Sequence, residues 1–149
     1  NNAAKQIARR LLDSVPFVYA PRPLRSAATR WQTQINENSK MLCLSGEAPE
    51  MDHNQIVGWI DGDRDPRNRP VMLLPRSGQC QATSLMRTTI ELLMEHGIDT
   101  VVADLEGGSP LESALHGIML GDFVSYYLAM LREVDPTPVT SINELKSRR

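Results

Sequence analysis

The sequence predicts a three-layer α/β/α sandwich built on a parallel sheet of four or five strands. Short apolar runs alternate along the chain with longer segments whose apolar positions recur at helical spacing. The apolar runs are nearly continuous, which is typical of strands that helices cover on both faces. The chain has 149 residues, enough for one domain with a sizeable core and too few for two.

The first half of the chain is expected to hold two helices and two strands. From Leu24 onward, the apolar positions 24, 28, 31 and 35 form the stripe of a helix that buries one face. Pro16 stops the first helix of the chain, and Gly46 and Pro49 mark a loop. The expected elements are a helix at 4–12, a strand at 17–19, a helix from 24 to about 38, a strand at 41–44 and a polar loop at 45–54.

The second half continues this alternation. Gly97 stands at a helix C-cap, and Ser109-Pro110 supplies an N-cap and a first helical residue. Pro136 and Pro138 prevent that helix from continuing. The expected elements are a short apolar segment of undetermined type at 56–60, a solvated charged turn at 61–66, a strand at 70–74, a helix at 83–96, a strand at 100–103, a helix from 110 to about 132 and a short helix at 141–146.

Composition argues against several classes of protein. Sixteen basic and eighteen acidic side chains give a formal charge of −2, which disfavours a nucleic-acid binder. The longest apolar runs, such as 71–74, are too short to cross a membrane, and the first residues lack the layout of a secretory signal. A cytoplasmic protein is therefore expected. Cys43 and Cys80 form no CxxC pair and are expected to be buried thiols.

Common cofactor motifs are missing from the sequence. The three histidines lack the spacing of metal ligands, and the glycine-rich phosphate loops of nucleotide-binding proteins do not occur. The GxSxG motif of serine hydrolases is missing as well. We therefore expect no metal centre and no nucleotide cofactor.

Two polar clusters carry residues that suit proton transfer. Glu37 stands between Asn36 and Asn38 at the end of the second helix, where it either points away from the apolar stripe or lies past the last turn. A carboxylate there meets unfavourable dipole charge, but two asparagines can orient it by hydrogen bonds, as a general base requires. His53 lies in a loop among acids and amides, where a histidine titrates near neutral pH. The plainer alternative for each is a solvated surface side chain.

Taken together, these motifs resemble those of one enzyme family. The resemblance lies in Asn36-Glu37-Asn38-Ser39-Lys40, Pro49-Glu50 and His53-Asn54-Gln55-Ile56, which are similar to the run NEN-[AS]-K…PE…HNE-[IL] of the bifunctional phosphoglucose/phosphomannose isomerases. Residues 121–129 resemble that family's GDYVSxYLA helix, and 135–146 resemble its DPxPVxxIxxLK ending. The resemblance extends from Pro16 to Lys146.

The resemblance implies a sugar isomerase (SIS) domain with a flavodoxin-like parallel sheet. In that family the glutamate of the NEN motif moves a proton between C1 and C2 of the opened hexose 6-phosphate through a cis-enediol, a role that would belong to Glu37. A histidine contributed across a dimer interface assists ring opening, which is a role for His53. The terminal lysine, here Lys146, contacts the substrate near the ring oxygen. The expected substrate-binding residues are Asn36, Asn38 and Asn54, and no cofactor is implied.

The same resemblance implies partners. The family holds the substrate phosphate with a Ser/Thr-rich loop in a first SIS domain, so residues 1–149 are expected to form the C-terminal one of two such domains. The expected partners are a sugar phosphate, that N-terminal domain and a second subunit of a homodimer, and the isolated domain is expected to have little activity. Ser77, Thr83 and Ser84 offer a second place for an anion, although a turn and a helix start explain them without one.

Beside His53-Asn54 two residues depart from the family's pattern, and Ser39 is a milder change from the common alanine. Asp52 replaces the usual asparagine before the histidine, and Gln55 replaces the usual glutamate after Asn54. A negative charge on Asp52 would favour the protonated form of His53. These changes leave two non-enzymatic alternatives open: a regulatory domain that binds sugar phosphates, and a purely structural dimerisation domain.

Overall fold

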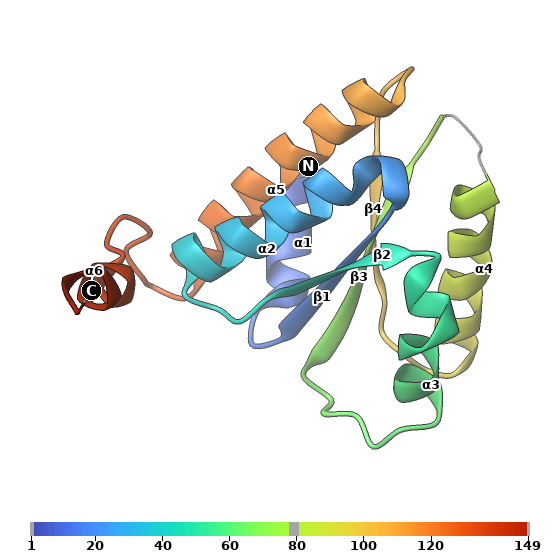
Figure 1. The fold of residues 1–149 in the computed structure, drawn as a ribbon, viewed down its shortest axis with the longest axis horizontal. Helices are drawn as coiled ribbons and strands as arrows, with labels where there is room; N and C mark the ends of the chain where they lie inside the picture. Colours follow the sequence, from blue (N-terminus) through green and yellow to red (C-terminus); the bar gives the residue numbers. More distant parts are fainter. Residues whose placement is uncertain (1, 78–80, 149) are drawn as a thin grey trace.

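A computed structural model describes residues 2–77 and 81–148 and shows a three-layer α/β/α sandwich (Figure 1). Within these residues the sheet has four strands, all parallel, in the order β2-β1-β3-β4. The strands are β1 (Val15–Pro21), β2 (Leu44–Ala48), β3 (Asn68–Pro75) and β4 (Val101–Leu105). The predicted fold class is confirmed.

Helices cover both faces of the sheet. One layer contains α1 (Ala3–Leu11), α2 (Arg25–Ser39) and α5 (Pro110–Leu131), and the other contains α3 (Gln55–Ile60) and α4 (Gln81–Glu95). Two 3₁₀ helices, Arg22–Leu24 and Glu50–His53, follow β1 and β2. The final helix, α6 (Thr140–Ser147), stands apart from the three layers, and none of its eight described residues is buried.

The core has two halves, one on each face of the sheet. Val71 and Leu73 of β3 lie in the half under α1, α2 and α5, whereas Met72 and Leu74 lie in the half under α3 and α4. Because both faces of β3 are buried from Pro70 to Pro75, the sequence there is continuously apolar and does not alternate with polar residues.

Close packing joins α2 to α5 because two glycines of α5 face α2. Trp31 Nε1 donates a hydrogen bond to the carbonyl oxygen of Gly117 at 2.7 Å. A Cβ atom built on Gly121 would overlap the Trp31 indole. Gly121 therefore has a packing reason to be glycine, and this contact holds the two helices in register.

The predicted position of the second strand is wrong. A strand is predicted at 41–44, but β2 begins at Leu44 and continues through residues expected to form a loop. Among the described residues β2 is an edge strand paired with β1 alone, so Leu44 and Ser45 are exposed and the sequence of the strand is polar. The apolar Met41 and Cys43 are buried in the segment before it. Here an apolar run marks burial, not strand pairing.

The predicted C-cap of α4 and N-cap of α5 are confirmed, whereas α1 ends at Leu11 and Pro16, predicted to stop it, lies inside β1. Gly97 closes α4 with a φ of 69°, and Ser109 caps α5 in a reciprocal capping box with Glu112. The apolar segment of undetermined type forms α3. Cys43 is buried as expected, and the prediction for Cys80 lies outside the described residues.

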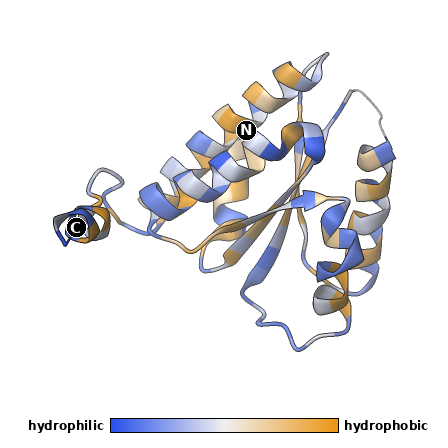
Figure 2. Ribbon diagram, viewed as in Figure 1, coloured by the Kyte–Doolittle hydropathy of each residue, from blue (hydrophilic) through white to orange (hydrophobic). Residues whose placement is uncertain are grey.

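The 22-residue helix α5 is apolar on more than its inner face. Figure 2 shows hydrophobic residues along it and a more hydrophilic α2 beside it. By length and composition alone α5 would qualify as a membrane-spanning helix, which the short contiguous runs in the sequence did not indicate. Its inner face packs in the core against α1 and α2, as in a core helix of a globular domain.

Candidate active site around Glu37

Glu37 lies in the last turn of α2, with its side chain exposed. The apolar stripe of α2 is buried, so the carboxylate points away from the core, as predicted. Among the described residues, none donates a hydrogen bond to this carboxylate. The hydrogen bond to Asp122 is the main cause of the raised pKa of Arg30, and the charge of Glu37 makes a smaller contribution in the same direction.

Asn36 is held by main-chain groups on both sides. Its Nδ2 donates to the carbonyl oxygens of Gln32 at 2.7 Å and Cys43 at 3.0 Å, and its Oδ1 accepts a hydrogen bond from the Cys43 amide at 3.2 Å. The side chain therefore pairs with the Cys43 backbone in the way that a neighbouring strand would. This pairing joins the end of α2 to the start of β2.

Asn38 and Ser39 join the same turn to α5. Asn38 Nδ2 donates to the hydroxyl oxygen of Ser125 at 2.9 Å, and the buried Ser39 hydroxyl donates to the Ser125 carbonyl oxygen at 2.8 Å. Ser125 lies in the segment 121–129 that the sequence comparison singles out. Two of the quoted motifs are thus in direct contact.

Lys40 joins the turn to the third motif. The residue adopts the left-handed conformation that ends α2, with a φ of 54°. Its Nζ donates to the carbonyl oxygens of Pro138 at 2.8 Å, Pro136 at 3.3 Å and Glu37. Lys40 is the last residue of the 36–40 motif, and the sequence alone assigned it no role. In the structure it anchors the loop that leads to α6.

Lys146 lies in α6 and is exposed. Figure 1 shows α6 beyond the end of the molecule at which α2 terminates. The main attachment of the preceding loop at this end is the Lys40 ammonium group. Glu37 and Lys146 therefore lie at the same end of the domain. Lys146 is held there less firmly, because it stands on a helix with no buried residue that follows the loop bound by Lys40.

His53 lies at the opposite end of the domain. It ends the 3₁₀ helix that follows β2, at the carboxyl edge of the sheet, whereas Glu37 lies just before β2 begins. The fifteen residues of α2 run antiparallel to the strands and span about 22 Å. One copy of this chain does not bring Glu37 and His53 together.

The residues on either side of His53 contact α3 and α4. Asn54 Oδ1 accepts a hydrogen bond from the Gln55 amide at 2.6 Å and caps α3. Asp52 is turned toward α4, where the Thr89 hydroxyl donates to its Oδ1 at 2.7 Å. Its other oxygen, Oδ2, is buried and has no hydrogen-bond partner among the described residues. Burial raises the pKa of the Asp52 carboxyl, while the Thr89 hydrogen bond and the charge of His53 oppose that rise.

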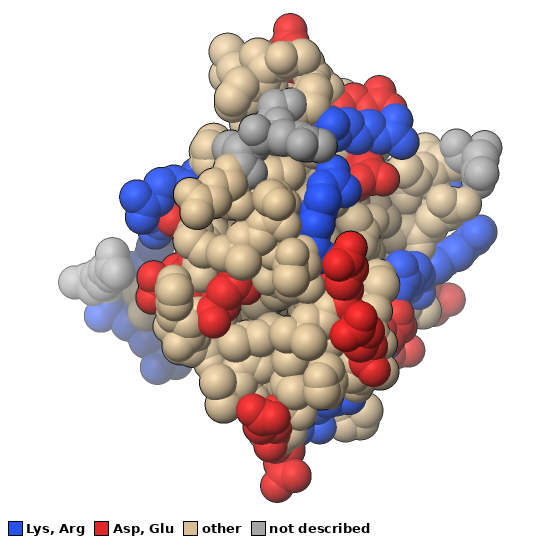
Figure 3. All heavy atoms as spheres, turned by 90° about the vertical axis from the view of Figure 1, so that its right-hand side faces the viewer, with Lys and Arg blue, Asp and Glu red and all other residues tan. Residues whose placement is uncertain are grey.

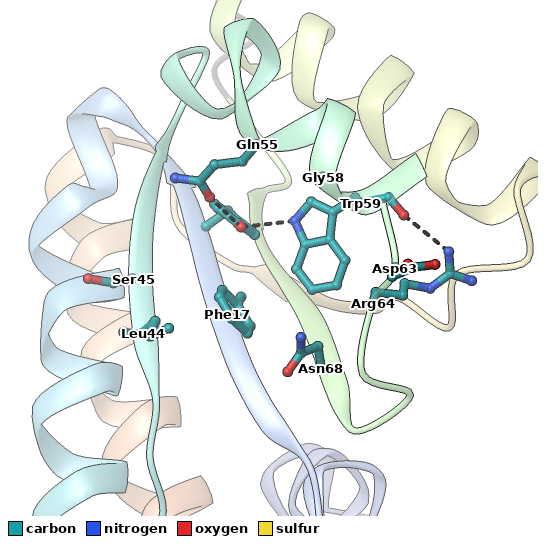
Figure 4. A pocket seen from close by; sticks show the side chains of 10 residues that line it. Phe17, Leu44, Ser45, Gln55, Gly58, Trp59, Asp63, Arg64 and Asn68 are labelled. Carbon is teal, nitrogen blue, oxygen red and sulfur yellow. Dashed lines mark hydrogen bonds between the residues drawn. The ribbon is translucent and has the colours of Figure 1, made fainter. Parts of the chain in front are cut away.

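A hollow of about 420 Å³ lies beside α3 (Figure 4). Trp59 Nε1 donates to the Tyr19 hydroxyl oxygen at 3.0 Å, and that hydroxyl donates to Gln55 Oε1 at 2.6 Å. Burial raises the pKa of Tyr19 to about 12, so the phenol stays a donor. Phe17 meets Trp59 edge to face, with ring centroids 5.2 Å apart. This hollow was not predicted from the sequence. The available signal was that Phe17 and Tyr19, two positions apart on a strand, share one face of it.

None of the three predicted catalytic residues lines this hollow. Gln55 does line it, so the departure from the family's usual glutamate has a structural partner in Tyr19. Over the face that carries α4, acidic and basic side chains both lie among uncharged ones (Figure 3). Across the described parts of the chain, no group of three or more His, Cys, Asp or Glu side chains is arranged to hold a metal ion.

Residues 1–148 match the family described as the bacterial phospho-glucose isomerase C-terminal SIS domain. The chain belongs to this family. The match covers all of the quoted motifs, so the resemblance seen in the sequence is confirmed. The SIS domain described here is thus of the C-terminal type.

Several relatives of this SIS domain are named bifunctional phosphoglucose/phosphomannose isomerase. The protein from Aquifex aeolicus is 35% identical over 144 residues, which are 95% of this chain and 44% of the relative. The protein from Thermoplasma volcanium is 33% identical over 148 residues, 98% of this chain and 47% of the relative. The chain thus spans about half the length of these relatives.

Solved structures share the fold of this SIS domain. A glucose-6-phosphate isomerase like protein from Thermus thermophilus superposes with a TM-score of 0.74 at 24% identity, over 98% of this chain and 47% of that one. The C-terminal domain of glucosamine-fructose-6-phosphate aminotransferase from Francisella tularensis gives a TM-score of 0.69 at 14% identity, over 89% of this chain and 40% of that one. At these identities the likeness concerns the fold.

Proposed function

We propose that this chain is the C-terminal catalytic domain of a phosphosugar isomerase that converts glucose 6-phosphate and mannose 6-phosphate into fructose 6-phosphate. One observation supports this function above the others. The four residues around Glu37 in the motif are tied to other parts of the domain, and Glu37 alone presents a free side chain. A fixed helix end that carries one free carboxylate is suited to a general base.

In the proposed reaction Glu37 accepts the proton from C2 of the opened aldose and returns it to C1. The proton of the C2 hydroxyl passes to O1, so that the aldehyde becomes a hydroxymethyl group and C2 becomes the ketone. The transition states on either side of the cis-enediol develop negative charge on the oxygen, which a nearby cation stabilises. Lys146, at the same end of the domain as Glu37, is the proposed cation.

His53 is the proposed group that opens the sugar ring, and it acts in the site of a second copy. Since His53 and Glu37 lie at opposite ends of one chain, a site that needs both residues needs two chains. The homodimer is thus part of this proposal. The substrate phosphate is proposed to bind in the preceding domain of a longer chain, because the family is C-terminal and its relatives are about twice as long.

The three asparagines Asn36, Asn38 and Asn54 have different roles in this proposal. Asn36 and Asn38 hold Glu37 in place through their bonds to Cys43 and Ser125, and Asn54 caps α3 beside His53. Substrate contact by Asn36 would have to coexist with three hydrogen bonds to the backbone. Positioning is therefore the main role that we assign to Asn36 and Asn38.

The deciding experiment measures isomerisation by the full-length protein that contains this domain. Glu37→Gln keeps the size of the side chain and removes the base, so kcat should fall by about 10²–10⁴-fold with the melting temperature unchanged. The matched control is Glu95→Gln, which changes an exposed glutamate in the last turn of α4 and should leave kcat unchanged. Turnover that survives Glu37→Gln would remove Glu37 from the mechanism.

A regulatory domain that binds sugar phosphates without turnover is the second candidate. The observation in its favour is that the residues on both sides of His53-Asn54 differ from the family's pattern, with Asp52 turned to Thr89 and Gln55 held by Tyr19. Deuterium exchange at C2 of bound glucose 6-phosphate separates the two functions. Saturable binding of the sugar phosphate to the full-length protein with no exchange would favour the regulatory domain.

A further inference from the structure

The outer face of α5 is a continuous apolar stripe. Six large side chains recur every three or four residues along it, and each is between 45 and 69% exposed. These residues, called the α5 stripe below, are Leu111, Leu115, Met119, Phe123, Tyr126 and Met130. A run of exposed apolar residues of this length on one helix marks a surface that is covered in the working protein.

The inner face of the same helix is already buried. Val124 and Leu128 lie in the core against α1 and α2. A helix that is apolar on both faces is normally buried on both faces. Within the described residues, the outer face has no such cover.

A hollow of about 580 Å³ lies where the α5 stripe meets α2. Its lining includes Met119, Phe123 and Tyr126 from the stripe and Asn38 from α2. Asn38 is the neighbour of Glu37 and donates to Ser125 on α5. The apolar surface therefore reaches the turn that carries the proposed base.

We propose that the α5 stripe is the docking surface for the preceding domain of the longer chain. The family is a C-terminal domain and the named relatives are about twice as long, so roughly half of such a chain precedes these residues. The docked domain would cover the hollow beside Asn38 and close one side of the site around Glu37. This consequence for Glu37 rests on the proposed function, whereas the docking itself does not.

The position of α1 supports this occupant. α1 packs against α5, and Lys5 Nζ lies 5.2 Å from the centroid of the Tyr127 ring. Tyr127 in turn contacts the rings of Phe123 and Tyr126, at centroid distances of 6.4 and 5.9 Å. A domain joined ahead of α1 is thus tethered beside the stripe, which raises its effective concentration there far above that of a free partner.

A second copy is the less suitable occupant of the stripe. A symmetric dimer places the same patch of each copy against the other. His53 belongs to the opposite side of the sheet, since the 3₁₀ helix that carries it packs toward α4 through Met51 and Asp52. Two copies joined through α5 would leave both histidines remote from the interface. The copy that supplies His53 must therefore approach Glu37 by another surface.

Thiol labelling of two cysteine variants tests this docking surface. Met119→Cys lies in the centre of the stripe, and the matched control Met94→Cys is a similarly exposed methionine on α4. Each variant is made in the 149-residue chain and in the full-length protein. Reaction with a maleimide is followed by mass spectrometry of the peptide that contains the new thiol, so the native cysteines do not interfere.

The expected result is a labelling rate at position 119 that falls on the order of tenfold or more in the full-length protein, as for a residue in a dry interface. The rate at position 94 should be equal in the two chains. Equal rates at 119 in the two chains would overturn the proposal. Protection at 119 in the 149-residue chain that disappears on dilution would assign the stripe to a second copy. Protection that needs lipid vesicles would assign it to a membrane, and either result also overturns the proposal.

This test does not depend on catalysis. If the full-length protein protects position 119 but does not isomerise hexose 6-phosphates, the docking surface stands and the proposed function fails. If it isomerises these substrates and leaves position 119 reactive, the function stands and the α5 stripe has another occupant.

Discussion

The end of α2 and the loop after β2 differ in how their polar residues are held. Around Glu37, the neighbouring side chains bond to the segment just before β2, to α5 and to the loop before α6, which are three separate parts of the chain. Around His53, Asn54 bonds to the next residue and to Glu50, and Asp52 reaches one hydroxyl on α4. A base that removes a proton from carbon must be fixed before substrate binds. If His53 works in another subunit's site, as proposed, its position there is set by the assembly.

Complementation between subunits is the strongest test of this contrast. A heterodimer of one Glu37→Gln chain and one His53→Gln chain has two sites if each site combines the two subunits. One of these sites keeps both native residues, and the other has lost both. We expect about half of the wild-type activity, although each homodimer is nearly inactive. The heterodimers are isolated with two affinity tags on the full-length chains, and glucose 6-phosphate turnover is measured.

The matched control pairs a wild-type chain with a chain that carries both changes. If each site takes Glu37 from one subunit and His53 from the other, both sites of this heterodimer are broken and activity is lost. If both residues act within one chain, the control keeps half of the activity and the first heterodimer keeps none. The two heterodimers thus give opposite results for the two arrangements.

Alanine substitution of two asparagines compares the two ends directly. Asn36→Ala removes three hydrogen bonds and leaves buried backbone groups of Cys43 unpaired, so it should lower the free energy of unfolding by about 2 kcal/mol. Asn54→Ala removes the cap of a six-residue helix and should cost about 1 kcal/mol or less. Urea unfolding of the 149-residue chain measures both values. Equal losses would show that the end of α2 is not more firmly braced.

The sequence predicts the elements with a buried apolar face better than the strand at the edge. β3, buried on both faces, follows from its apolar run, and α4, buried on one face, follows from its helical spacing. β2 is misplaced because an edge strand needs pairing partners and not apolar side chains, and its pairing with β1 is a long-range fact. The hollow beside Trp59 is missed for a similar reason, since its walls come from separate segments.

In the candidate site too, contiguous residues could be predicted and long-range contacts could not. The motif identifies Glu37 and its two asparagines because these residues are contiguous in sequence. The bonds that link Asn38 to Ser125 and Lys40 to Pro138 cross 87 and 98 positions, and no periodicity along the chain indicates them. The placement of Glu37 and His53 at opposite ends could not be predicted from their separation in sequence, because it depends on the direction in which α2 and β2 run.

Asp52→Asn should change stability in a way that depends on pH. Burial raises the pKa of Asp52 above its ordinary value of 3.8, because Oδ2 has no partner and the charged form is poorly solvated. The folded state therefore holds this proton more tightly than the unfolded state. It follows that the carboxyl costs no stability below about pH 3.8, and that the cost grows as pH rises through the folded pKa and stays constant above it.

Asparagine keeps an oxygen that accepts from Thr89 and carries no charge. The variant should therefore be more stable than the wild type at pH 7, by about 0.5–1 kcal/mol given the solvent that still screens part of the carboxylate, and no more stable near pH 3.5. Thermal unfolding at the two pH values measures the difference, with Thr89→Val as the control that leaves the charge and removes its donor. A stabilisation that is the same at both pH values would mean that the gain comes from packing. The carboxylate of Asp52 would then be as well solvated in the folded domain as in the unfolded chain.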